Sequence, residues 1–286
     1  MEFNYLHFSD LLSESLEKRA EGILNPSHSI DEIDAYRLIF SCIDHTSLEA
    51  TDHQARIVDF CKTAVEFGSM AGGGLHVAAV CVYPVFAAAA AGELKGSGIL
   101  TACVAGAFPS GQAPLHTRLE EARFAIGQGA EEIDMVISRG RLMAGEYDFV
   151  FDEIAAFREV CGHRTKLKVI LETGELKEAL LICKASEIAL KAGADFLKTS
   201  TGKISTGATA PALLLMMDCI RAWHADSGKK CGIKASGGIV EPQQALDCYL
   251  LVKACLGHDW LDPMVFRIGA SRLTPRVLAM CSDNNG

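Results

Sequence analysis

Eight short runs rich in valine, isoleucine and leucine alternate along the chain with longer stretches that have helical spacing. The runs are residues 38–43, 75–83, 99–106, 132–137, 167–172, 195–199, 231–235 and 265–269, and the stretches include 115–128, 147–161, 176–192, 210–223 and 242–251. Strands that are apolar on both faces belong to parallel sheets covered by helices. Eight such runs with seven connectors and a closing helix predict a (β/α)8 TIM barrel. An open doubly wound sheet is the alternative, but no G-x-G-x-x-G follows the first run.

The length of the chain fits a single barrel with a short addition at its N-terminus. The chain has 286 residues, and a TIM barrel usually takes about 250. Residues 1–35 read as polar helix and loop, broken by Gly22 and by the turn signal at Asn25 and Pro26. We therefore expect an N-terminal helical extension at 1–35, acting as a cap or an oligomer contact, and a catalytic (β/α)8 barrel domain at 36–286.

Charge, hydropathy and cysteine usage exclude several classes of protein. The net charge is −9, without a basic stripe, which argues against nucleic acid as a partner. The N-terminus lacks the pattern of a signal peptide, and the most apolar segment, 75–91, is short for a membrane span and contains Pro84. The 11 cysteines form no C-x-x-C pair, which favours buried, reduced thiols. We expect a soluble, cytoplasmic protein with no membrane partner.

Ionisable residues at the ends of the apolar runs are the informative ones, because TIM-barrel active sites lie at the carboxyl ends of the strands. Asp134 lies within the fourth run, and Glu172, Lys198 and Lys234 end the next three. Alternation places Lys198 and Phe196 on one face of their strand. Buried charges are costly, so such a set is either a structural ion-pair network or a reactive site.

Two lysines on adjacent strands suit imine chemistry. A lysine becomes a nucleophile when desolvation or a neighbouring cation lowers its pKa. Lys198 and Lys234 offer that pairing, and Asp134 could relay protons. The histidines are scattered, without H-x-x-x-H spacing, so we expect no metal and no cofactor.

Glycine-bearing loops after the last two runs are candidates for binding an anion. The loops read Ala-Ser-Gly-Gly at 235–238 and Gly-Ala-Ser-Arg at 269–272, and the sixth run is followed by Thr-Ser-Thr-Gly-Lys at 199–203. In many barrels the loops after strands seven and eight hold a phosphate on backbone N–H groups. A glycine pair that merely ends a strand is the alternative for either loop alone.

Several segments resemble, in order, those of the deoxyribose-phosphate aldolase family. The segments are Asp-His-Thr-Ser-Leu (44–48), Val-Cys-Val-Tyr-Pro (80–84), Glu-Ile-Asp-Met-Val-Ile (132–137), Lys-Val-Ile-Leu-Glu-Thr-Gly-Glu-Leu (168–176), Asp-Phe-Leu-Lys-Thr-Ser-Thr-Gly-Lys (195–203), Gly-Ile-Lys-Ala-Ser-Gly-Gly-Ile (232–239) and Phe-Arg-Ile-Gly-Ala-Ser (266–271). The resemblance covers residues 37–273. The segment around Lys198 is the most specific.

The resemblance implies a reaction and a set of roles. The reaction is the reversible cleavage of 2-deoxy-D-ribose 5-phosphate into acetaldehyde and D-glyceraldehyde 3-phosphate. Lys198 is implied to form the imine, and Lys234 and Asp134 to move protons. The residues implied around the phosphate are Gly202, Lys203, Gly237, Gly238, Gly269, Ala270 and Ser271. Cys81 is expected near the site without a required role, and Glu172, Asp44 and Lys168 beside it, with structural ion pairing as the favoured alternative.

The chain departs from the family pattern in two places near the expected site. Arg272 stands where a second small hydroxyl residue often follows Gly-Ala-Ser, and the tail at 280–286 lacks a terminal tyrosine. Two other functions stay open: a barrel imine aldolase for a different sugar phosphate, and a non-catalytic phosphosugar-binding or scaffolding protein. The chain could also assemble into a homo-oligomer.

Overall fold

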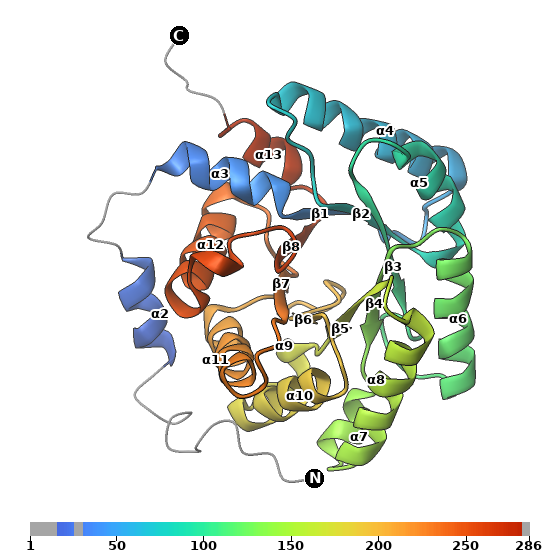
Figure 1. Ribbon diagram of the computed structural model, residues 1–286, viewed down its shortest axis with the longest axis vertical. Coiled ribbons are helices and arrows are strands. Elements are labelled where there is room, and N and C mark those ends of the chain that lie inside the picture. Colours follow the sequence, from blue (N-terminus) through green and yellow to red (C-terminus); the bar gives the residue numbers. More distant parts are fainter. Residues whose placement is uncertain (1–15, 26–30, 282–286) are drawn as a thin grey trace.

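The computed structural model describes residues 16–25 and 31–281, and within them eight parallel strands form a closed barrel (Figure 1). The strands pair in chain order, and the last pairs with the first. They are β1 (Ile43–Thr46), β2 (Ala79–Val82), β3 (Leu100–Ala105), β4 (Glu132–Val136), β5 (Lys166–Ile170), β6 (Phe196–Lys198), β7 (Gly232–Ser236) and β8 (Phe266–Ala270). The predicted (β/α)8 TIM barrel is confirmed.

Helices surround the barrel on its outside (Figure 1). Those of the described residues are α2 (Leu16–Leu24), α3 (Glu32–Ser41), α4 (Gln54–Ala71), η1 (Pro84–Phe86), α5 (Ala87–Leu94), α6 (Leu115–Gly127), α7 (Arg139–Met143), α8 (Tyr147–Cys161), α9 (Thr173–Leu176), α10 (Ala179–Lys191), α11 (Ala210–Ser227), α12 (Pro242–Leu256), η2 (His258–Trp260) and α13 (Thr274–Leu278). Short side-chain caps fix several starts: the Thr209 side chain accepts a hydrogen bond from the backbone of Ala212 at the start of α11.

Alternation along the strands divides the core into two parts. On β4, Ile133 and Met135 belong to the large apolar core between the barrel and its helices. A second, smaller apolar cluster lies in the barrel interior and includes Cys81 and Val104. Because successive side chains of a strand point to opposite faces, Asp134 points to the interior. The rest of the interior is therefore available for charged side chains.

The first strand does not lie where the sequence predicted it. The apolar run at 38–43 is mostly the end of α3, and β1 begins only at Ile43. The side chain of Asp31 caps α3 by accepting from the backbone N–H of Ile33 at 3.1 Å. Tyr36, Ile39 and Phe40 are buried on one face of this helix. A run of apolar residues without alternation fits a helix as well as a strand.

Two helical expectations are also corrected. Gly22 does not break the N-terminal helix, because α2 runs through it. The stretch at 176–192 is not one helix: α10 begins at Ala179, after Lys177 adopts a positive φ of 57°. Such a backbone conformation ends a helical run.

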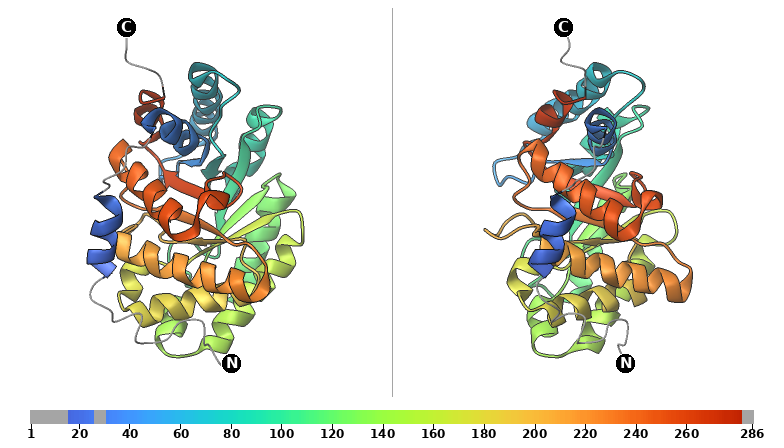
Figure 2. Two further views of the ribbon diagram at one scale, coloured as in Figure 1. Left: turned by 60° about the vertical axis from the view of Figure 1, so that its left-hand side comes forward. Right: turned by 90° about the vertical axis from the view of Figure 1, so that its left-hand side faces the viewer.

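Helix α2 packs on the outside of the barrel against α11 and α12 (Figure 2). Arg19 donates a hydrogen bond to Asp218 of α11 at 2.6 Å. The expected boundary between residues 35 and 36 falls inside α3. The division into an extension and a barrel domain stays a prediction.

All 11 cysteines are free and buried, which confirms the expectation of buried, reduced thiols. Within residues 16–25 and 31–281, no helix has both the length and the apolar character needed to cross a membrane.

Candidate active site

The barrel brings the predicted charged residues together in its interior. Lys198 on β6 is the direct register partner of Lys234 on β7, and Asp134 on β4 is the partner of Lys168 on β5. Asp44 comes from β1. All five side chains are buried. The strands thus place residues that are up to 190 positions apart in sequence within hydrogen-bonding distance.

Asp134 is the centre of this arrangement. Its Oδ2 atom accepts hydrogen bonds from the Nζ atoms of Lys198 and Lys234, each at 2.7 Å, and its Oδ1 atom accepts one from Lys168 at 2.9 Å. Because the Nζ atoms of Lys198 and Lys234 share Oδ2 of Asp134, the distance between them is at most twice the length of one of these two bonds. At this separation one ammonium influences the pKa of the other.

Two further residues complete the barrel interior, and the sequence interpretation did not single them out. The guanidinium of Arg267 on β8 donates to Asp44 at 2.7 Å and to Glu132 at 2.8 Å. Glu132 also accepts from Lys168. Strand alternation was a usable signal for Glu132, because it lies two residues before Asp134 and so shares its face. We call the buried charged set the interior cluster; it consists of Asp44, Glu132, Asp134, Lys168, Lys198, Lys234 and Arg267.

The interior cluster has four cationic groups and three carboxylates. If every group were charged, one positive charge would be left without a partner in a buried site, which is costly. Loss of a proton from one lysine removes the excess. The lysine with the lowest pKa is the one that loses its proton first.

The surroundings make Lys198 the most readily deprotonated lysine of the cluster. Burial lowers the pKa of Lys198, and the charge of Lys234 lowers it further, against the opposing effect of Asp134. Burial alone would also lower the pKa of Lys234 and of Lys168, but Asp134 and Asp44 outweigh it and raise both. The three lysines in turn hold the pKa of Asp134 well below its usual range, although burial opposes them.

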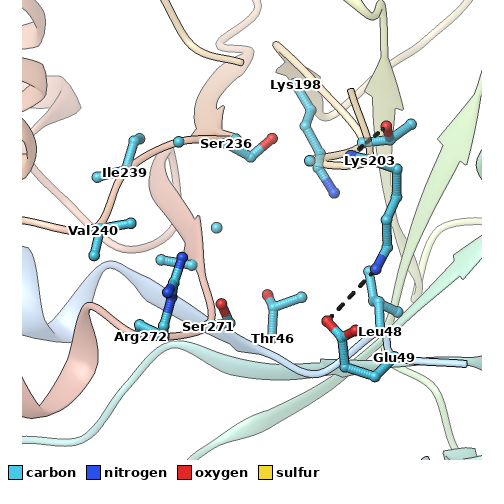
Figure 3. Close-up of a pocket in the computed structure, with 16 residues that line it drawn as sticks. Thr46, Leu48, Glu49, Lys198, Lys203, Ser236, Ile239, Val240, Ser271 and Arg272 are labelled. Carbon is cyan, nitrogen blue, oxygen red and sulfur yellow. Dashed lines mark hydrogen bonds and ion pairs between the residues drawn. The ribbon is translucent and has the colours of Figure 1, made fainter. Parts of the chain in front are cut away.

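A cavity of about 180 Å³ opens above Lys198 at the carboxyl ends of the strands (Figure 3). Lys198 extends into it, whereas Lys234 and Asp134 do not line it. The residues expected around a phosphate all line this cavity: Gly202, Lys203, Gly237, Gly238, Gly269, Ala270 and Ser271. The amine and the anion loops therefore face one space.

The glycines serve different purposes. Gly237 and Gly238 have φ angles of +88° and +80°, which side chains rarely adopt, and a Cβ atom at Gly237 would lie 2.8 Å from the backbone of Gly207. A Cβ atom at Gly269 would come within 3.0 Å of Cε of Lys234. Gly269 thus leaves room for the Lys234 side chain. This requirement for glycine is separate from the expected approach of a phosphate to the backbone.

Glu172 holds the loop that carries Gly202 and Lys203. Its carboxylate accepts from the Ser200 hydroxyl at 2.5 Å and from the Thr201 backbone at 3.2 Å. Arg139 donates to the same carboxylate at 3.1 Å. Glu172 itself has a φ of 58°, so its backbone conformation is strained. These contacts connect Glu172 to the loop that lines the cavity.

Cys81 lies in the barrel interior beside the cluster. Burial raises the pKa of its thiol to about 11, so it is protonated near neutral pH. Thr201, Ser236 and Arg272, which belong to the segments proposed for anion binding, also line the cavity, and the sequence interpretation missed five further lining residues: Thr46, Leu48, Glu49, Ile239 and Val240. Thr46 ends β1, and the other four lie within four residues of the end of β1 or β7, which was an available signal. The end of the C-terminal tail, residues 282–286, falls outside the described residues.

Comparisons with known proteins agree on one family. The model of the DeoC/LacD family aldolases matches residues 38–250. The deoxyribose-phosphate aldolase of Homo sapiens is 44% identical over 241 residues, covering 81% of this chain and 76% of the relative. That of Agrobacterium fabrum is 40% identical over 246 residues, covering 86% and 91%. The crystal structure of a protein from Coccidioides immitis that is described as a deoxyribose-phosphate aldolase aligns with a TM-score of 0.71 at 29% identity. The alignment covers 93% of this chain and 97% of that chain.

Proposed function

The chain belongs to the DeoC/LacD aldolase family and is therefore an aldolase, and we propose that it cleaves 2-deoxy-D-ribose 5-phosphate reversibly into D-glyceraldehyde 3-phosphate and acetaldehyde through a Schiff base on Lys198. One observation carries this proposal. Among the described residues of the interior cluster, Lys198 alone lines the cavity, and its pKa is lowered. An amine that is both accessible and readily deprotonated is suited to attack an aldehyde.

Each step follows from the position of the amine. The neutral nitrogen of Lys198 adds to C1 of the open-chain sugar, and loss of water leaves an iminium. Removal of the proton from the C3 hydroxyl breaks the C2–C3 bond and releases D-glyceraldehyde 3-phosphate. The electron pair moves onto the iminium and forms an enamine. Protonation at C2 and hydrolysis release acetaldehyde and restore Lys198.

Asp134 and Lys234 supply the proton transfers in this proposal. The Oδ2 atom of Asp134 lies 2.7 Å from both lysine nitrogens, which is within reach of direct proton transfer. Loss of water from the carbinolamine requires a proton, and Lys234 is a nearby acid. Asp44 and Lys168 keep this pair charged and oriented, and we assign them no contact with the substrate.

The substrate phosphate is proposed to bind at the opposite side of the cavity from the amine. The loops at 237–238 and 269–271 offer backbone N–H groups, and Lys203 and Arg272 offer positive charge. Arg272 replaces a small hydroxyl residue of the family pattern, so we assign it to the phosphate as a second cation.

We expect Gly238→Val to raise the KM for deoxyribose 5-phosphate by about tenfold or more. A branched side chain at a φ of +80° strains the loop and blocks the approach of the phosphate to its backbone. The KM for unphosphorylated deoxyribose should change much less. Steady-state kinetics with both sugars measures the difference. Gly145→Val is the matched control, because Gly145 has a φ of +79° and open surroundings but does not line the cavity. Equal losses on both sugars would mean that the loop is only structural.

Product analysis tests the proposed reaction itself. We expect deoxyribose 5-phosphate to yield acetaldehyde and D-glyceraldehyde 3-phosphate in equal amounts, and the reverse mixture to yield the sugar phosphate. Binding without turnover would instead support a phosphosugar-binding protein. Faster turnover of another sugar phosphate in a substrate panel would identify a different aldolase.

The cellular location and the oligomeric state of the protein are also part of this proposal. Eleven free, buried cysteines fit a reducing compartment, which supports a cytoplasmic location. Assembly into a homo-oligomer stays a prediction.

A further inference from the structure

We propose that Glu49 determines how tightly the site holds phosphorylated compounds, because its carboxylate pairs with Lys203 and must release it to the phosphate. This inference rests on the phosphate site proposed above. The Nζ atom of Lys203 lies 3.6 Å from Oε1 of Glu49, and both residues line the cavity above Lys198 (Figure 3). Glu49 thus sits where an anion is expected to bind.

The chain fixes the backbone of Glu49 and leaves its carboxylate exposed. The backbone N–H of Glu49 donates to the carboxylate of Asp52 at 2.9 Å, and the hydroxyl of Ser47 donates to the same carboxylate. The side chain of Asp52 is fully buried. The side chain of Glu49 is 58% exposed, and that of Lys203 is 31% exposed. Glu49 therefore stays beside the cavity while its side chain can turn away from Lys203.

Glu49 is also the only acidic residue lining the cavity among residues 16–25 and 31–281. The other charged side chains there are those of Lys198, Lys203 and Arg272. A phosphate offers more acceptor oxygens and more negative charge than a carboxylate, and Arg and Lys bind it readily. Because like charges at short range repel, the Glu49 carboxylate and a phosphate dianion compete for Lys203.

This competition should lower the affinity of the site for phosphorylated compounds, which can be measured. Glu49 weakens the binding of phosphorylated substrate and of phosphorylated product alike, and so favours release of D-glyceraldehyde 3-phosphate. An unphosphorylated sugar does not engage Lys203 as an anion, so the competition does not act on it. The ion pair between exposed side chains is weak, and repulsion between the carboxylate and the phosphate adds to its effect. We therefore expect removal of the charge to tighten phosphate binding by about 3- to 10-fold.

Calorimetric titration with inorganic phosphate tests the proposal directly. Glu49→Gln should bind phosphate about 3- to 10-fold more tightly than the natural protein at low salt, and the difference should shrink as salt rises. Glu120→Gln is the control. Glu120 is 69% exposed and pairs with Arg123 on α6, which lies on the other side of the barrel from α12 and α13 (Figure 1) and contributes no residue to the cavity lining. The Glu120→Gln substitution removes the same charge as Glu49→Gln and should leave phosphate binding unchanged.

A second pair of variants tests whether Glu49 acts through Lys203. In a Lys203→Met background, Glu49→Gln should have a much smaller effect on phosphate affinity. An equal effect in both backgrounds would overturn the proposal, since Glu49 would then act through its general field. Unchanged or weaker phosphate binding by Glu49→Gln, or no phosphate binding by any of the variants, would also overturn it.

The same proteins separate this inference from the proposed function. If Glu49→Gln binds phosphate more tightly but no variant cleaves deoxyribose 5-phosphate, the reaction assignment fails and the role of Glu49 stands. If cleavage proceeds and phosphate affinity does not change, only the role of Glu49 fails. With an active enzyme, Glu49→Gln should lower the KM for the phosphorylated sugar relative to the KM for deoxyribose.

Discussion

Sodium borohydride added together with acetaldehyde should leave one ethyl group on the ε-nitrogen of Lys198 and on no other lysine. Acetaldehyde forms an imine with a neutral amine, and borohydride reduces that imine to a stable secondary amine. Lys198 is the only lysine of the interior cluster that lines the cavity. Burial and Lys234 also lower its pKa. Digestion and peptide mass mapping locate the adduct.

Removal of the Lys198 amine is expected to have the largest effect on activity. Lys198→Met should reduce kcat by about 10⁴-fold or more, because no other group at the cavity floor can form the imine. The substitution removes one of the four cations of the interior cluster and leaves three cations for three carboxylates. We therefore expect Lys198→Met to fold normally, which circular dichroism checks. Lys203→Met is the control and should still be labelled at Lys198. Labelling at Lys203 or Lys234 with Lys198 untouched would contradict the assignment.

Removal of the Lys234 charge is expected to have the second largest effect, visible in both rate and pH dependence. Lys234 disfavours the protonated form of Lys198, so Lys234→Leu should raise the pKa of Lys198. The variant would leave Lys168, Arg267 and Lys198 as the only cations facing three carboxylates. Electrostatic balance then requires Lys198 to stay protonated, which raises its pKa further.

The pH profile of imine formation measures this change. A higher pKa means that the neutral amine appears only at higher pH, so the profile of Lys234→Leu should move by about one unit or more to the alkaline side. Each unit corresponds to about 1.36 kcal/mol. Loss of the proton donor should also lower kcat by about 10²- to 10⁴-fold at neutral pH.

Lys234→Arg separates the two roles of this residue. Arginine keeps the positive charge, so the alkaline shift should be smaller, but it does not lose a proton in proteins and is a poor donor. Turnover should therefore stay low. An unchanged pH profile in Lys234→Leu would mean that burial alone, and not Lys234, activates the nucleophile.

The barrel and the meeting of Lys198 and Lys234 were readable from the sequence. Seven of the eight expected strand positions were correct, because a strand buried on both faces needs a continuous apolar run. Lys198 and Lys234 end neighbouring runs, so their meeting followed from the order of strands in a parallel barrel. The first strand was misplaced because Ile39 and Phe40 are equally compatible with the buried face of a helix.

The rest of the site depended on tertiary structure. Alternation shows which face of a strand a side chain occupies, but the partners of Asp134 depend on how the strands are staggered around the closed barrel. Arg267 meets Asp44 across 223 positions of sequence, and only closure of β8 onto β1 creates that contact. Glu49 and Lys203 belong to loops whose paths no periodic pattern predicts. The sequence by itself therefore determined the architecture and the position of the lysine proposed to react, whereas the charge balance that sets the pKa of that lysine was decided by the folded barrel.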